Sequence, residues 1–175
     1  GITVRPLINM AGRHGFNVDP SPHDLEDTYL PAFRAAIVDA HAGSIMCAYN
    51  AIGGTPVCAL PWLLGERLRK DWHFQGYVVS DCDAIDDMTR FHHYRADNAD
   101  SAASALRAGT DLDCGDAYGA LAKAAAEGKV DTRSIDTAAE RLFTARFRLG
   151  MFDPPTQAWR TGTTETAADR QLALR

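Results

Sequence analysis

The sequence predicts an α/β fold in which the strands of a parallel sheet alternate with helices. Three short apolar runs begin near Ser44, Tyr77 and Thr110, about 33 residues apart, which is the length of a strand, a crossover helix and two loops. Segments with helical periodicity fill the intervals. Three strands can neither close an eight-stranded barrel nor form a well-covered open sheet. We therefore expect the chain to be part of a larger (β/α) domain.

The N-terminal part is expected to hold an irregular segment and then a long helix. Residues 1–20 contain glycine, proline and asparagine without periodicity, which is typical of an irregular, truncated leading segment. A helix is predicted over 21–41. Ser21 can cap it, Pro22 suits its first position and Asp24 stands at its third. The predicted apolar face repeats every four residues and consists of Leu25, Tyr29, Phe33 and Ile37.

Two apolar runs in the middle of the chain are predicted as buried strands, over 44–49 and 77–80. Between them a helix is predicted over 61–72, with apolar residues along one face. Leu60 cannot cap this helix and Gly65 lies within it. Each feature costs about 1 kcal/mol of helix stability.

The C-terminal half repeats the alternation. An acidic, histidine-bearing loop is expected after the second strand, followed by an alanine-rich helix over 97–108 and a third short strand over 110–114. A further helix is predicted over 117–127. In parallel α/β folds the chemistry lies where the strands end, so candidate functional residues are sought there.

A last long helix is predicted over 131–149, with signals at both ends. Asp131 can cap its first turn, and Val130 and Ile135 stand at the positions of a hydrophobic staple. Gly150 occupies the position where a left-handed residue commonly ends a helix.

Composition limits the possible classes of function. The chain has 175 residues, of which 46% are hydrophobic and 23% charged, which is typical of a globular domain. It contains no apolar run of about 18 residues, so no membrane span is predicted. Its formal charge of -5 with scattered basic residues argues against nucleic acid as a partner.

Four cysteines have spacings that match no zinc finger and are too sparse for a disulfide-stabilised miniprotein. They are Cys47, Cys58, Cys82 and Cys114. Two interpretations remain open. The thiols are free and buried in a reducing compartment, which we favour, or they form one or two bridges in an exported enzyme.

Asp81 is the main candidate for catalysis, because it follows the apolar run 77–80 directly. A strand end is a rigid support at the edge where a substrate would bind. An ionised carboxylate in this position could attack the anomeric carbon of a sugar and form a glycosyl ester. The alternative is that Asp81 caps a following helix, which is a common use of aspartate and which spacing alone slightly favours.

The other polar residues near the strand ends are expected to have structural roles. The acidic run 81–87 lacks the glycine and the terminal glutamate of a calcium loop, so no metal is predicted, although a metal-dependent (β/α) enzyme is kept as a rival. His92 and His93 are adjacent and are expected in a solvated loop. For Met46 core packing is the default. Residues expected to cap helices or to face solvent are Asp111, Asp113 and Asp116.

Five blocks of sequence resemble, in order, the N-terminal barrel of family 3 glycoside hydrolases. The blocks are RHGFNVDPSPHDLEDTYLPAF, SIMCAYNAIGGTPVC, LRKDWHFQGYVVSDCDAI, AGTDLDCG and RLFTARFRLGMFD. They cover about residues 13–153, and the most specific is GYVVSDCDAI, which resembles the nucleophile segment of the family. Cys82 stands where other members have tryptophan, which places the chain nearer the β-xylosidase and related bacterial β-glucosidase branch.

The resemblance implies a partial (β/α)8 TIM barrel within a larger enzyme of two or three domains. The three predicted strands would be the sixth to eighth of that barrel. Residues 21–153 would form the C-terminal portion of the barrel domain, and 154–175 would be a linker toward a missing second domain. The intact enzyme would be periplasmic or secreted rather than cytoplasmic.

The resemblance also implies roles for individual residues. Asp81 would be the nucleophile, and this implication outweighs the helix-cap alternative. Tyr49 and Met46 would bind substrate around the sugar in the first subsite. No cofactor or metal is implied. In an exported enzyme the cysteine pairs that the loops would permit are Cys47 with Cys58 and Cys82 with Cys114.

The chain departs from the family in ways that limit its activity. No lysine-histidine segment precedes Arg13, and neither the first five strands nor the second domain with its acid/base is present in the chain. The expected function of the intact protein is that of a retaining exo-β-glycosidase, a β-D-glucosidase or β-D-xylosidase. Its substrate would be an oligosaccharide or an aryl or alkyl β-glycoside, and the chain alone would be inactive. The alternative is a noncatalytic carbohydrate-binding or interaction module, and oligomeric state is not predicted.

Overall fold

The computed structural model describes residues 10–154 and 166–174. The chain divides into two units at residues 145 and 146, and each is considered by itself. In the first unit the α-helices are α1 (Met10–His14), α2 (Pro22–Asp24), α3 (Leu30–Arg34), α4 (Ala84–Arg90), α5 (Asn98–Ala108), α6 (Leu121–Ala126) and the greater part of α7 (Thr132–Arg148). Within the described ranges, no helix is long and apolar enough to cross a membrane.

Short helices of other kinds and five short strands complete this unit. The π-helical segments are η1 (Leu25–Tyr29), η2 (Ala35–Asp39) and η4 (Trp62–Asp71), and the 3₁₀ segments are η3 (Val57–Ala59) and η5 (Ala117–Ala120). The strands are β1 (Asn17–Val18), β2 (Ser44–Cys47), β3 (Ala51–Ile52), β4 (Thr55–Pro56) and β5 (Tyr77–Ser80).

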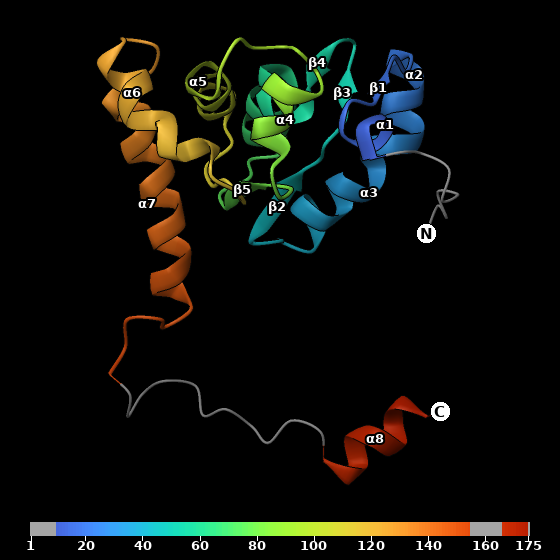
Figure 1. Ribbon diagram of the computed structural model, residues 1–175. Helices are drawn as coiled ribbons and strands as arrows, with labels where there is room; N and C mark the ends of the chain where they lie inside the picture. The colour runs from blue at the N-terminus through green and yellow to red at the C-terminus, as the bar shows by residue number, and fades with distance from the viewer. Residues whose placement is uncertain (1–9, 155–165, 175) are drawn as a thin grey trace. The chain divides into compact units, whose positions relative to one another are not determined.

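The parallel pairing predicted from the sequence is present between β2 and β5. The two strands run beside each other (Figure 1). Ser44 lies opposite Tyr77, and the register continues to Cys47 opposite Ser80. The predicted third strand is reduced to one parallel bridge between Val79 and Leu112. It is short because Asp113 and Cys114 bond to the Ser80 side chain, and Asp113 also to the following 3₁₀ segment, in place of backbone pairing with the sheet. The α/β fold class is thus confirmed, with a smaller sheet than predicted.

A second small sheet was not predicted. β3 and β4 form a hairpin through Gly53 and Gly54, whose φ angles are 56° and 80°, and β1 pairs with β3 in parallel. The expectation that 1–20 is irregular is therefore wrong for α1 and β1, and residues 1–9 of that segment lie outside the described residues. Strands of two residues are too short to leave a period in the sequence, and Asn17 fixes the hairpin by accepting the backbone N–H of Gly54 at 2.8 Å.

The long helix predicted over 21–41 is found as a continuous helical segment from α2 to η2. Ser21 accepts the backbone N–H of Asp24 at 3.1 Å, as the capping pattern predicts. The predicted apolar face is only partly buried, because Ile37 is in the core while Tyr29 and Phe33 are 57% and 51% exposed. The two π-helical stretches change the helical period, so residues four apart no longer share one face.

The helix predicted over 61–72 corresponds to η4. Its Leu64 and Leu68 are buried, and no side chain caps its start. The carbonyl of Leu60 accepts the backbone N–H groups of the first turn, from Leu63 at 3.2 Å and from Leu64 at 3.0 Å. A backbone carbonyl thus accepts hydrogen bonds in the first turn, where no side chain caps the helix.

Helix α4 occupies a segment that was predicted as a loop. Its residues Ala84, Ile85 and Met88 are buried, and their spacing places them on one face of the helix. The aspartates between them obscured this pattern in the sequence. The helix matters for the site, because it begins three residues after Asp81.

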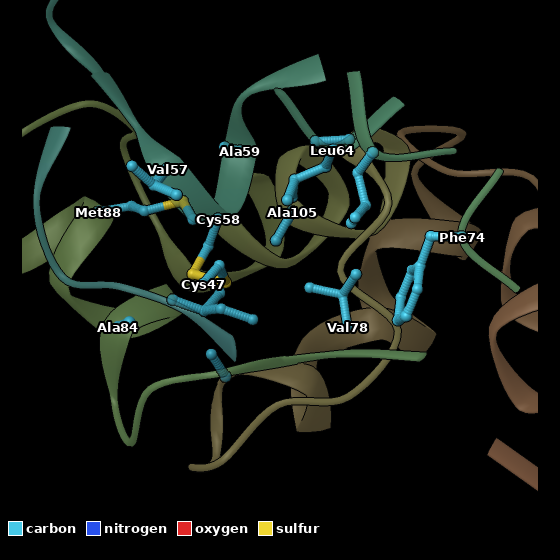
Figure 2. Packing of buried hydrophobic residues seen from close by; sticks show 14 of the residues in the cluster. Cys47, Val57, Cys58, Ala59, Leu64, Phe74, Val78, Ala84, Met88 and Ala105 are labelled. Atoms are coloured by element: carbon cyan, nitrogen blue, oxygen red, sulfur yellow. A yellow bond between two sulfur atoms is a disulfide. The ribbon is translucent and has the colours of Figure 1, made fainter. Parts of the chain in front are cut away.

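The main core lies around β2, β5, η3, η4 and α4. Figure 2 shows Met88 and Val57 near the bridged Cys47 and Cys58, with Val78 and Phe74 on the other side of the cluster. Val78 and Met88 are fully buried. Burial of each large apolar side chain contributes about 1.5–3 kcal/mol, so this cluster fixes the ends of both central strands.

A second cluster joins α5, α6 and the start of α7. Small residues of α5, Ala99 and Ala103, allow the helices to approach closely. Val130 is buried here with Ile135 packed against the same cluster, so the predicted staple is confirmed. Asp131 accepts the backbone N–H of Ser134 at 2.8 Å, which confirms the cap of α7.

In the second unit, residues 146–175, the end of α7 has the predicted glycine stop. Gly150 has a φ of 69°, and the N–H groups of Gly150 and Met151 bond to the carbonyls of Phe147 and Arg146. The segment 154–175, expected to be a linker toward a second domain, contains a helix that was not predicted. There α8 (Ala167–Ala173) forms behind a capping box of Thr166 and Asp169.

Candidate functional site

Asp81 lies directly after β5, at the carboxyl end of the parallel pair. Its backbone N–H donates to the carbonyl of Cys47 at 2.8 Å, which continues the β2–β5 ladder by one residue. Its side chain is half-buried, and its Oδ1 accepts the backbone N–H of Cys82 at 2.8 Å. The turn thus orients one oxygen of the Asp81 carboxylate.

The Asp81 side chain does not cap the following helix. Asp83 holds the N-cap position of α4, with a left-handed φ of 66°, and no side chain caps that helix. Asp81 contributes only its carbonyl, which accepts the N–H of Ala84 at 3.0 Å. The helix-cap alternative is therefore wrong, and the carboxylate is available for chemistry.

Tyr49 is brought next to Asp81. The Tyr49 hydroxyl donates to the carbonyl of Cys82 at 2.7 Å. Burial raises the pKa of Tyr49, and the neighbouring Asp81 carboxylate raises it further, while Arg13 opposes this shift. The phenol therefore stays neutral and can donate a hydrogen bond beside the carboxylate.

Met46 lies elsewhere. It is 53% exposed, so the expectation of core packing is wrong. Its side chain lines an open apolar pocket of about 510 Å³ together with Phe16, Tyr29 and Phe33. Asp81 does not line this pocket.

The four cysteines form two disulfides, so the preference for free thiols is wrong. Cys47 is bonded to Cys58, and Cys82 to Cys114, the pairs that the family resemblance permits. The second bridge ties the loop after β5 to the loop after Leu112. Beside it the N–H of Asp83 donates to the carbonyl of Cys114 at 2.6 Å. Both loops next to Asp81 are thereby fixed.

The three aspartates around the third strand have different roles. Asp111 is buried between two arginines, at 2.6 Å from Arg69 and 2.8 Å from Arg141, so the expectation that it caps or faces solvent is wrong. Asp113 accepts the backbone N–H of Tyr118 at 3.0 Å, which is a capping role. Asp116 is exposed and its side chain caps nothing.

The sequence did not predict the group of side chains around Tyr49. The His14 ring lies 4.4 Å from the Tyr49 ring, centroid to centroid, and its Nδ1 donates to the Asp87 carboxylate. His92, expected in a solvated loop, donates from Nε2 to the Tyr49 carbonyl at 2.7 Å. His93 is exposed as expected. His14 and Asp87 are 73 residues apart, and no local pattern links them.

The acidic run after β5 is divided between different partners. Asp86 pairs with Arg90 at 3.0 Å and accepts from Asn98 at 2.9 Å, whereas Asp87 faces His14. Among the residues that the structure describes, no three histidine, cysteine, aspartate or glutamate side chains gather in a way that could hold a metal ion.

The chain belongs to glycosyl hydrolase family 3. Residues 10–145 match the N terminal domain of that family. The "Probable exo-1,4-beta-xylosidase" of Aspergillus clavatus is 43% identical over 150 residues, which is 83% of this chain and 20% of that protein. A beta-xylosidase/alpha-L-arabinofuranosidase of Medicago sativa is 39% identical over 142 residues, 81% of this chain and 18% of that protein.

Solved structures agree with this assignment. A GH3 exo-beta-xylosidase in complex with a xylobiose aziridine probe has a TM-score of 0.78 and 33% identity, over 82% of this chain and 19% of that one. A beta-glucosidase from Listeria innocua in complex with glucose has a TM-score of 0.81 and 30% identity, over 95% of this chain and 23% of that one. The chain thus spans about a fifth of the length of the relatives it matches.

Proposed function

We propose that the intact protein is a retaining exo-β-glycosidase in which Asp81 is the nucleophile. The observation that carries this proposal is the setting of Asp81, at the end of β5, with one carboxylate oxygen oriented by the Cys82 N–H and the neutral Tyr49 hydroxyl beside it. The Asp81 carboxylate attacks the anomeric carbon as the bond to the leaving group breaks, and water later hydrolyses the glycosyl ester.

The reaction needs a second carboxyl group. In retaining enzymes the two carboxyls lie about 5–5.5 Å apart, and the second protonates the leaving group and then activates water. We assign this group to a part of the intact protein outside this chain. The chain spans about a fifth of its relatives' length, which supports that assignment. The chain alone should therefore not turn over an aryl β-glycoside.

Tyr49 is proposed to line the first sugar subsite, since its hydroxyl lies beside Asp81. Met46 remains a second substrate-binding proposal with less support, because it lines the separate apolar pocket. The relatives' names favour terminal β-xylosides and β-glucosides as substrates. These would be oligosaccharides or aryl or alkyl β-glycosides.

The larger architecture is also part of the proposal. β2, β5 and residues 110–114 would be strands six to eight of a (β/α)8 barrel, whose C-terminal portion spans 21–153. The parallel β2–β5 pair and the bridge to Leu112 support this order. Residues 154–175 would lead to the second domain.

A 2-fluoro β-glycoside with a good leaving group tests the nucleophile, because the fluorine slows hydrolysis of the glycosyl-enzyme. In the intact protein, mass spectrometry should find the sugar on the peptide that contains Asp81, and Asp81→Asn should abolish the label. Asp83→Asn is the matched control, since asparagine tolerates the left-handed backbone there. A label on another carboxylate would refute the assignment.

The same experiment separates the rivals. A noncatalytic sugar-binding module would bind the glycoside without acquiring a label. A metal-dependent enzyme would lose its activity in excess chelator, whereas the proposed mechanism needs no metal and predicts that activity is retained.

A further inference from the structure

A charged and aromatic cluster packs against the ring of Tyr49. It joins α1 to α4 through the His14–Asp87 contact. Asp87 is 2% exposed and His14 is mostly buried. A buried carboxylate is costly unless it is paired, so this contact holds the end of α1 against α4.

The histidine in this pair lies against two aromatic rings. Its ring centroid is 4.4 Å from that of Tyr49, with the two rings tilted, and 5.2 Å from that of Phe91, which directly follows α4 and stacks on the imidazole. Asp87 accepts from His14 Nδ1 and thereby fixes the rotation of the imidazole. The ring that touches Tyr49 therefore has one orientation, set from the opposite edge by a buried charge.

Tyr49 needs such support because it lies beyond the end of β2, where the sheet no longer fixes it. Contacts from α1, from His92 and from the loop after β5 converge on it. The Arg13 guanidinium lies 5.0 Å from the ring centroid, the His14 ring packs against it, His92 donates to its carbonyl, and its hydroxyl donates to Cys82. The His14 contact is anchored in turn by the buried carboxylate of Asp87.

We propose that His14 and Asp87 are a positioning pair that holds Tyr49 against the Asp81 carboxylate. The inference rests on the proposed glycosidase function. Neither residue touches the reacting atoms. Both act through the Tyr49 ring, whose hydroxyl must stay beside Asp81 while charge develops there. A displacement of about 1 Å in a catalytic geometry can cost about a hundredfold in rate, so loss of the pair should slow the step without preventing folding.

The test treats the intact protein with a 2-fluoro glycoside, which labels the nucleophile covalently. The dependence of the labelling rate on glycoside concentration gives two quantities, the dissociation constant of the non-covalent complex and the first-order rate constant of labelling. Asp87→Asn removes the charge with little change of shape. His14→Phe keeps an aromatic ring against Tyr49 but loses the contact with Asp87. The matched control is Asp86→Asn, which alters the adjacent aspartate and its surface pair with Arg90.

We expect Asp87→Asn and His14→Phe each to lower the labelling rate constant about tenfold, with the dissociation constant changed less than about threefold. Asp86→Asn should label at the wild-type rate. The double variant Asp87→Asn with His14→Phe should have a labelling rate constant no lower than that of the slower single variant, because both substitutions break the same contact. A merely structural pair would lower the thermal midpoint and leave the rate constant of the folded fraction unchanged, and that result would overturn the proposal.

A conservative variant keeps the test decisive if His14→Phe does not fold. His14→Asn places an amide N–H near the position of Nδ1, so it should keep the contact with Asp87 and recover folding. It lacks the ring, however, and its labelling rate constant should stay about tenfold low. A wild-type rate in His14→Asn would overturn the proposal. Failure of the wild-type protein to label at Asp81 would refute the proposed function itself, which is a separate outcome.

Discussion

Asp111 is a single carboxylate that forms ion pairs with two arginines. It accepts from Arg69 at 2.6 Å, from Arg141 at 2.8 Å and from the backbone N–H of Val78 at 2.8 Å. Because its removal leaves charge without a partner in a buried setting, Asp111→Ala should lower the free energy of unfolding by about 3–5 kcal/mol. Urea denaturation of this chain measures the loss. Asp116→Ala, at an exposed aspartate nearby, should change it by less than about 0.5 kcal/mol, and equal losses would contradict the prediction.

The contrast between Asp81 and Asp111 shows what a residue's sequence position can predict. The apolar strand before Asp81 fixed its place at the sheet edge, so a catalytic interpretation could be made locally. The partners of Asp111 are Arg69 and Arg141, 42 and 30 residues away. Asp87, the partner of His14, is 73 residues away in the sequence. Polar side chains that pair over such distances leave no period in the sequence, so their burial was not predicted.

At the scale of elements, the N-terminus of α5 carries a pH-sensitive cap. Asp97 accepts the backbone N–H of Asp100 at 2.9 Å, and Lys123 donates to its other oxygen at 3.0 Å. The backbone hydrogen bond, aided by Lys123, lowers the pKa of Asp97 to about 2. The unfolded chain has a value of about 3.9, so the ionised cap stabilises the fold above about pH 4 and this contribution is lost as the pH falls toward 2.

Asp97→Asn should therefore reduce the acid dependence of stability. Asparagine is also a good N-cap, but it does not titrate. We expect the urea midpoint of the wild-type chain to fall more steeply between pH 4 and 2 than that of the variant. Asp116→Asn, at an aspartate without a side-chain cap, serves as control and should follow the wild type. Parallel curves for wild type and Asp97→Asn would rule out this account.

The Cys82–Cys114 bridge connects two loops that hold the site. It closes a loop with a sequence separation of 32 residues. A crosslink of this length stabilises a fold by about 2–4 kcal/mol, mainly through the unfolded chain. The double variant Cys82→Ser with Cys114→Ser should lose about this amount in chemical denaturation. Wild type measured with excess reductant should lose at least as much, since both bridges then open, and an unaffected double variant would contradict the prediction.

The elements that were predicted well are those with a strong local signal at both ends. Helix α7 has Asp131 at its start and Gly150 at its end, and both act as predicted. Helix α4 was missed because aspartates interrupt its apolar positions. The third strand was predicted too long because Asp113 bonds to Tyr118 and to Ser80 rather than continuing the ladder. Side-chain hydrogen bonds of this kind compete with regular secondary structure, and which of the two forms depends on residues that the fold brings together.

At the scale of the whole first unit, several large apolar side chains that no other described part of the chain covers form an apolar surface. The predicted face of the long helix was expected in a core, yet Tyr29 and Phe33 remain exposed and meet Phe16 and Met46 around the pocket of about 510 Å³. A contiguous apolar pocket of this kind is unusual on an isolated soluble domain. Hydrophobic periodicity placed Tyr29 and Phe33 on an apolar helix face. It does not indicate whether another part of the same chain packs on that face.

This surface should be measurable in the purified 175-residue chain. We expect it to bind the dye ANS, and Phe33→Ser combined with Met46→Ser should remove most of the fluorescence, because both side chains line the pocket. Both are more than half exposed, so the free energy of unfolding should change by only about 0.5 kcal/mol. Phe143→Ser is the control, since Phe143 is 48% exposed but does not line this pocket. An equal loss of ANS fluorescence in the control would contradict the prediction. The dye would then bind exposed apolar side chains in general rather than this pocket.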